Sequence, residues 1–231
     1  MVHMSRPTGA SGPAFVRLLA RLGELPVPQP RQVLAERLSL WLGWTDAIAL
    51  SAVLNGGAKM AAAAALPAET AEEECARVRA ELARSIMQDK VLHPPRGNAR
   101  RGAAAAVDPG VEEDYSRYGQ RYASKQQMME TTIAALRGRL RARLAAISPE
   151  MARLAGVDAV MERILGAQER TLLASVPSLL EGHFGRLRRR AQAAAPAWLD
   201  VFRKDMESVL LAELDFRLQP VEGLLAALRV S

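Results

Sequence analysis

Hydrophobic residues recur at intervals of three and four along most of the chain, the spacing that places side chains on one face of an α-helix. Capping residues, prolines and glycines divide this pattern into separate helices. Thr70 and Glu73, for example, match the capping box that opens a helix. The expected helices span about 12–23, 31–42, 45–55, 70–92, 111–147, 149–175, 176–194 and 198–218, with a short one after Pro220. No segment alternates with a period of two, so the sequence predicts an all-α protein.

The segment 111–147 carries the longest uninterrupted pattern. On a helix, ten apolar or aromatic side chains fall within about 40° of Leu140. They are Val111, Tyr115, Tyr118, Tyr122, Met129, Ile133, Leu136, Leu140, Leu144 and Ile147. Such a helix is about 55 Å long and needs a partner helix along its length, from the same chain or from a second one. The three tyrosines share the leucine stripe, so we expect packing rather than stacking on nucleic-acid bases.

Composition shifts along the chain suggest an N-terminal compact helical unit followed by a long-helix bundle or antiparallel coiled-coil-like array. We expect a disordered N-terminus over residues 1–11 and an N-terminal helical domain over residues 12–93. Residues 94–110 are rich in Pro, Gly and Arg and are interpreted as a linker. Residues 111–231 are expected to form a basic long-helix bundle domain.

The charge pattern restricts the classes of partner. The net charge is +6, and the whole excess lies in residues 116–231. A basic domain is the electrostatic footprint of a protein that binds nucleic acid or another anionic surface. The alternative is an ordinary solvated helical surface that carries a modest excess of arginine. Aromatic residues make up only 4% of the chain, which further disfavours a β-protein.

Catalytic and metal-binding patterns are largely missing from the sequence. Cys75 is the only cysteine, so neither an internal disulfide nor a multi-cysteine metal site can form. Lys59 follows two glycines, but the context is a helix end rather than a phosphate-binding loop. His183 has no second ligand at suitable spacing, which favours a packing or hydrogen-bonded role. We therefore expect a non-enzymatic protein with no metal, no cofactor and no catalytic residues.

One arginine cluster lies on both sides of the long apolar stripe. Arginines that flank a seam in this way resemble the positions that pair across a coiled coil. They predict an interface with a helical partner protein, or with another copy of the chain. The expected interface residues are Leu136, Arg137, Arg139, Leu140, Arg141, Arg143 and Leu144.

A second arginine cluster lies on one outward helix face, at Arg186, Arg189 and Arg190. Three guanidinium groups on one face can bind phosphates and gain from counterion release. The alternative is a solvated face, since cations also stabilise a helix C-terminus. Arg96, Arg100 and Arg101 in the expected linker would join a nucleic-acid site only if both segments share a surface. We expect DNA rather than RNA as the ligand.

The N-terminal region resembles a known protein family. The resemblance rests on TGASG (residues 8–12), FVRLLARL (15–22) and LAERLSLWLGWTDAI (34–48). These runs are similar to the start of an uncharacterised proteobacterial family, a domain of unknown function. Members resemble an accessory component of Zorya-type anti-phage defence systems. They are encoded beside proteins similar to a proton-channel motor subunit and an outer-membrane peptidoglycan binder. The resemblance implies a cytoplasmic accessory protein of antiviral defence and supplies no catalytic residues.

Two functions follow from these patterns. The first is nucleic-acid binding through arginine-rich helical faces, as an accessory protein of defence. The alternative is an assembly adaptor that docks helical partner proteins of the same operon and binds no nucleic acid. Residues 1–7 lack the apolar core of a secretory signal, and no apolar stretch approaches the roughly 20 residues that span a bilayer. We therefore expect a cytoplasmic location and no integral membrane segment.

Overall fold

The computed structural model describes residues 14–24, 43–55, 70–94, 114–191 and 197–230, and these residues form helices without any strand. The all-α prediction is confirmed. The helices are α1 (Ala14–Gly23), α3 (Trp44–Asn55), α4 (Ala71–Met87), α6 (Tyr115–Ala145), α7 (Pro149–Leu173), α8 (Val176–Arg190) and α9 (Ala197–Val230). The helix expected at 31–42, the N-terminus at 1–11 and nearly all of the predicted linker lie outside the described residues.

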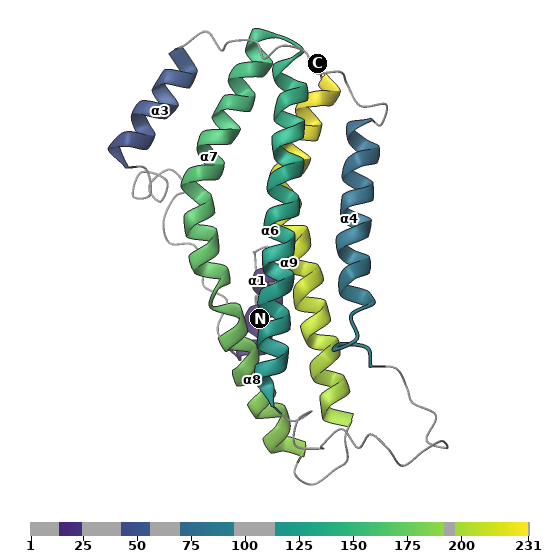
Figure 1. Ribbon diagram of the computed structural model, residues 1–231. Coiled ribbons are helices and arrows are strands. Elements are labelled where there is room, and N and C mark those ends of the chain that lie inside the picture. The colour runs from purple at the N-terminus through teal and green to yellow at the C-terminus, as the bar shows by residue number, and fades with distance from the viewer. Residues whose placement is uncertain (1–13, 25–42, 56–69, 95–113, 192–196, 231) are drawn as a thin grey trace, which may run out of the picture.

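Helix α6 lies at the centre of a bundle and packs on α4, α7, α8 and α9 (Figure 1). Polar contacts give the direction of each neighbour. Arg203 and Glu213 of α9 contact Tyr118 and Tyr122 in the same order, so α9 runs parallel to α6. Helices α4 and α7 run antiparallel to α6, which agrees in part with the antiparallel array that the sequence predicts.

The apolar stripe of α6 is buried inside this single chain. Leu136, Leu140, Leu144 and Tyr122 are 0% exposed, and Tyr118 is 2% exposed. The expectation that the tyrosines pack in the core is therefore confirmed for Tyr118 and Tyr122. The stripe ends before Ile147, which is 46% exposed. The long helix thus finds its partner helices within the chain.

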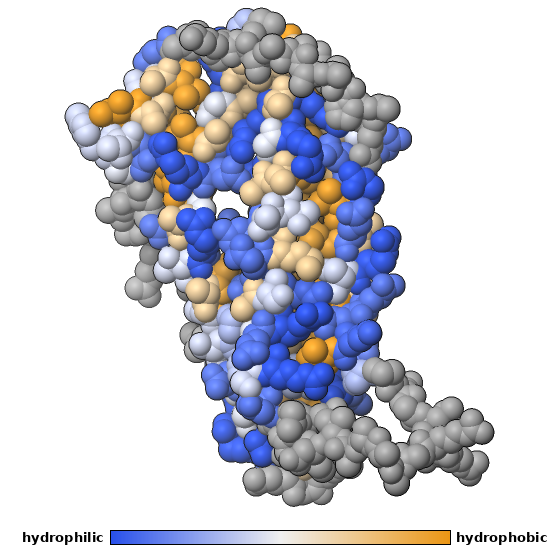
Figure 2. All heavy atoms as spheres, in the orientation of Figure 1, coloured by the Kyte–Doolittle hydropathy of each residue, from blue (hydrophilic) through white to orange (hydrophobic). Residues whose placement is uncertain are grey.

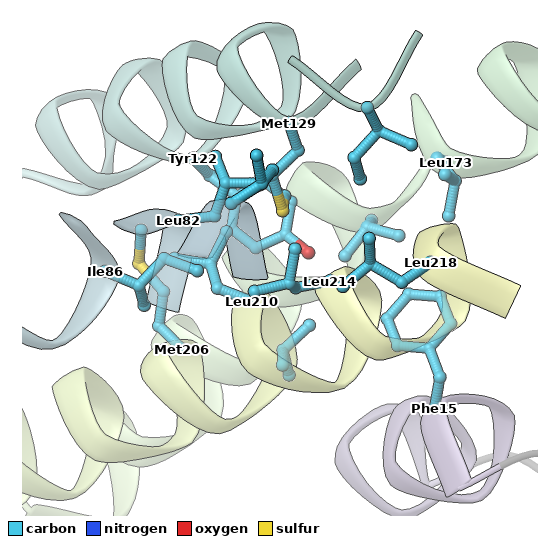
Figure 3. Close-up of a cluster of buried hydrophobic side chains, with 14 of the residues drawn as sticks. Phe15, Leu82, Ile86, Tyr122, Met129, Leu173, Met206, Leu210, Leu214 and Leu218 are labelled. Carbon is cyan, nitrogen blue, oxygen red and sulfur yellow. The ribbon is translucent and has the colours of Figure 1, made fainter. Parts of the chain in front are cut away.

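The first helices of the chain contribute to the same core as the last ones. Figure 3 shows Leu82 of α4 close to Leu210 of α9, and Phe15 of α1 close to Leu218 of the same helix. Helix α1 packs on α8 and α9, α4 on α6 and α9, and α3 on α7. Helices α1 and α4 of the expected domain 12–93 therefore share one hydrophobic core with the helices of the expected domain 111–231.

The C-terminal helix differs from the sequence expectation. The pattern predicts a stop near Leu218 and a separate helix after Pro220, but α9 continues through Pro220 to Val230. An interior proline removes one backbone hydrogen bond and costs about 3 kcal/mol. Leu218, Val221 and Leu224 on either side are at most 4% exposed. Their burial against the bundle offsets that cost, which local sequence rules do not include.

Helix α3 lies at the edge of the bundle and has no buried residue. It approaches α7 closely at Gly156. A Cβ atom at that glycine would lie 2.7 Å from Cγ1 of Val53, which is closer than van der Waals contact allows. The missing side chain at Gly156 therefore permits α3 to dock on α7. By contrast, a Cβ atom at Gly138 of α6 would meet nothing within 4 Å.

Two glycine-to-alanine changes test this docking. Gly138→Ala should stabilise the protein by about 0.5–1 kcal/mol, because alanine loses less backbone entropy in a helix. Gly156→Ala should lose that gain and displace α3, so amides of residues 44–55 should exchange faster with deuterium. Urea unfolding and hydrogen exchange measure the two effects. Equal stabilisation by both changes, with unchanged exchange in α3, would contradict the packing described.

Candidate functional site

The arginines that flank the α6 stripe form ion pairs with neighbouring helices. Arg137 and Arg141 both contact Asp158 and Glu162 of α7, at 2.5–3.3 Å. On the opposite flank, two further α6 arginines contact Glu74 of α4. The distances to Glu74 are 2.5 Å from Arg139 and 2.9 Å from Arg143. These pairs join α6 to α7 on one side and to α4 on the other.

The residues expected to form a partner interface are therefore engaged within the chain. Leu136, Leu140 and Leu144 are fully buried, and the four arginines already pair with carboxylates. A second protein could contact the leucines only if the bundle opened. Their role in binding another protein stays a prediction, and the packing lends it no support.

A polar network lies at the centre of the bundle around Glu213, which is 0% exposed. Its carboxylate accepts hydrogen bonds from the Tyr122 hydroxyl at 2.5 Å and from the Gln126 amide at 3.1 Å. Nε of Arg217 donates to the same carboxylate at 2.8 Å, and its Nη1 donates to Glu169 at 3.0 Å. Burial, followed by the charge of Glu213, raises the pKa of Tyr122 well above its usual value.

Sequence reasoning missed this network because Glu213 lies on the last helix without any catalytic motif nearby. One signal was available, since Glu213 and Arg217 are four residues apart and lie among the leucines of α9. Charged pairs at that spacing usually lie on a solvated face. Only the packing of Tyr122 and Gln126 from α6 shows that this pair is buried.

The second arginine cluster lies where α8 ends. Arg186 donates a hydrogen bond to the backbone carbonyl of Leu22, and its Nε lies 3.8 Å from Glu24. Arg190 pairs with Glu24 at 3.0 Å, but its side chain remains 71% exposed. Arg189 is also exposed. The cluster therefore combines one anchored arginine with exposed ones. Arg96, Arg100 and Arg101 lie outside the described residues.

Several segments meet at this end of the bundle. The last residues of α8 and the first residues of α6 and α9 lie together there, and α4 points toward the same end (Figure 1). Pro94, the first residue of the expected linker, follows α4, and Asp114 precedes α6, so both lie toward the same end as the α8 arginines. Exposed Lys90, Arg117 and Lys204 add positive charge there, beside the carboxylates of Glu24, Asp114, Glu181 and Asp200.

His183 has the structural role expected from the sequence. Its Nε2 lies 2.8 Å from the carboxylate of Asp205, so the pair joins α8 to α9. In the part of the chain that the structure describes, no three His, Cys, Asp or Glu side chains are grouped to hold a metal ion. None of the described helices combines the length and apolar character needed to cross a membrane.

The comparisons with other proteins give a family. The family described as "Protein of unknown function (DUF3348)" matches residues 1–230. No curated protein and no solved structure matches the chain. The resemblance to a family of unknown function is thereby confirmed over nearly the whole chain, and the match adds no activity, ligand or site.

Removing the carboxylate of Glu74 tests the ion pairs between α4 and α6. Glu74 is 3% exposed and contacts two guanidinium groups, so Glu74→Ala leaves the nearly buried Arg143 without this counterion. Breaking a buried pair typically costs about 3–5 kcal/mol. We expect a loss of about 3 kcal/mol in urea unfolding, because Arg139 is half exposed and water can solvate it.

The matched control is Glu81→Ala in the same helix. Glu81 pairs with Arg77 four residues away, and both side chains are about half exposed. Such pairs contribute about 0.3–0.5 kcal/mol. A similar loss of stability in the two variants would show that Glu74 does not hold α4 against α6 through its charge.

Proposed function

Because the chain belongs to this family of unknown function, we propose its function from the geometry. It is a non-enzymatic helical protein that binds nucleic acid, DNA in the first instance, at the end of the bundle where α8 ends. The observation that carries the proposal is the different environment of the two arginine clusters. Arg137, Arg139, Arg141 and Arg143 pair with carboxylates of α4 and α7. Arg189 and Arg190 are exposed at the end of α8, and the carboxylate that pairs with Arg190, that of Glu24, is itself exposed.

The exposed cluster has the properties that phosphate binding requires. Guanidinium groups form paired hydrogen bonds with phosphate oxygens and are weakly hydrated. Neutralising a phosphate releases condensed counterions, which favours binding at low salt. The basic excess of residues 116–231 strengthens the local field. Arg96, Arg100 and Arg101 would add to this site, because the described residues that bound their segment lie toward the same end.

An assembly adaptor is the second candidate function, and the surface of α3 favours it. Trp44 is 82% exposed, and Ile48 and Leu54 are each more than half exposed. Figure 2 shows hydrophobic residues gathered at the corner where α3 lies. Exposed apolar patches on a helix commonly mark sites of protein docking. In this second proposal the partner protein contacts α3, and the apolar stripe of α6 stays buried in the bundle.

The role in antiviral defence rests on the sequence resemblance alone. We propose that the chain acts in the cytoplasm as an accessory protein of a Zorya-type system. In a phage-resistant strain that encodes such a system, deleting the chain should restore plaque formation. An arginine-to-glutamine variant that no longer binds DNA should behave like the deletion. Full protection without the chain would contradict the defence role but would leave nucleic-acid binding untouched.

Changing the exposed arginines tests DNA binding directly. In Arg189→Gln/Arg190→Gln, affinity for duplex DNA should fall. The slope of log affinity against log salt should also decrease by up to about 0.9 for each arginine that contacts a phosphate. Arg186 is left in place because its contact with the Leu22 carbonyl helps to dock α1. Fluorescence anisotropy at several salt concentrations measures both quantities.

The control removes the same charge at the opposite end of the bundle. Arg153→Gln/Arg229→Gln changes two exposed arginines near the start of α7 and the end of α9. This variant should keep the salt slope of the parent protein. An unchanged slope in the α8 variant, or equal losses in both variants, would rule out the proposed site. Circular dichroism confirms that each variant is folded before binding is compared.

A further inference from the structure

A cavity of about 910 Å³ lies between α1, α6, α7, the start of α8 and α9, and none of the α8 arginines lines it. Its volume falls within the range of pockets that hold small organic molecules. Figure 2 shows the surface hollowed between α7 and α6 at the middle of the molecule. The cavity walls are largely apolar and include Phe15, Leu19, Ile133, Leu165, Leu173 and Phe216.

Most charged side chains on the walls of this cavity are matched by an opposite charge. Asp158 and Glu162 face Arg137 and Arg141, two carboxylates against two guanidinium groups. Glu130 pairs with Arg170 at 3.3 Å, and Arg163, which also lines the cavity, pairs with Asp46 of α3 at 3.0 Å. These groups together contribute no net charge to the cavity.

The two carboxylates that contact Arg217 are not fully matched by positive charge. Glu213 and Glu169 both contact the single guanidinium of Arg217, whose side chain is only 7% exposed. The other donors to Glu213 are Tyr122 and Gln126, which are neutral. Among these contacts, two carboxylates share one cation, and one negative charge is left in excess. Glu169 is the member of the pair that lines the cavity, and its side chain is 33% exposed.

The environment of Glu169 disfavours an isolated charge. Burial raises the pKa of its carboxyl group, the charges of Arg217 and Arg137 lower it, and those of Glu213 and Glu130 raise it, with a net shift upward. A cation that enters the cavity would relieve this excess of negative charge.

We propose that this cavity binds a small organic cation with an apolar body, whose ammonium or guanidinium group pairs with Glu169 while its hydrocarbon part contacts the apolar wall. The site is independent of the nucleic-acid surface. A charge-assisted hydrogen bond in a partly desolvated site is worth about 1.5–3 kcal/mol. Such a bond corresponds to about a tenfold or greater preference for a cation over a neutral molecule of equal shape.

Three probes of nearly equal shape test the proposal: phenylbutylamine, phenylbutanol and phenylbutyrate. Titration calorimetry on the whole chain near neutral pH should rank the amine about tenfold tighter than the alcohol, and the carboxylate weakest. Glu169→Gln keeps the size of the side chain and a hydrogen-bond acceptor for Arg217. It should bring the amine within about threefold of the alcohol and leave alcohol binding unchanged. Glu81→Gln, outside the cavity, should preserve the tenfold preference.

A second variant locates the bound molecule. Leu165→Trp adds bulk to the apolar wall and should weaken all three probes at least tenfold, with helicity checked by circular dichroism. Equal affinity of the amine and the alcohol for the unmodified chain would overturn the proposal, as would tightest binding of phenylbutyrate or no binding of any probe. Retained amine preference in Glu169→Gln, or retained binding in Leu165→Trp, would overturn the assigned position.

Discussion

Burial of one face of α6 is the constraint on which the rest of the bundle depends. A helix of 31 residues with a narrow apolar stripe needs other helices along its length to be stable in water. Here α9 lies parallel to it, and α4 and α7 lie antiparallel, so that Leu136, Leu140 and Leu144 lose all contact with solvent. Charged residues beside the stripe also constrain the packing. Glu74 of α4 pairs with the arginines on one flank of α6, and Asp158 and Glu162 of α7 pair with those on the other flank. The ion pairs therefore help to determine which helix lies on which side.

The same arrangement separates structural charge from charge that is open to a ligand. Arg137, Arg139, Arg141 and Arg143 of α6 pair with carboxylates of neighbouring helices, whereas Arg189 and Arg190 lie at an exposed end. Inside the bundle, the shared guanidinium of Arg217 leaves a partly buried carboxylate beside an apolar cavity. The basic residues thus enter the account in two ways, as ion pairs between the helices and as the site of the proposed nucleic-acid binding.

Local sequence rules predicted the helices well and their partners poorly. The capping box at Thr70 and the stripe of α6 are visible in the sequence because they depend on residues a few positions apart. Periodicity identifies which face of α6 is buried but cannot say which helix covers it, so the choice between one chain and two stayed open. Pro220 predicted a break that the structure does not have. The burial of Leu218 and Val221 offsets the cost of the proline, and this burial is a property of the tertiary structure that local rules do not include. Glu213 was overlooked for the same reason, since its partners lie on another helix.

Hydrogen exchange of α6 measured at several protein concentrations tests the central claim most directly. If the stripe is covered within one chain, amides from Ile133 to Leu144 should be among the slowest in the protein, with rates that do not change on dilution. Sedimentation under the same conditions should then show a monomer whenever these amides are protected. Protection of the same amides that disappears as the protein is diluted would show that a second chain covers the stripe and would contradict the account.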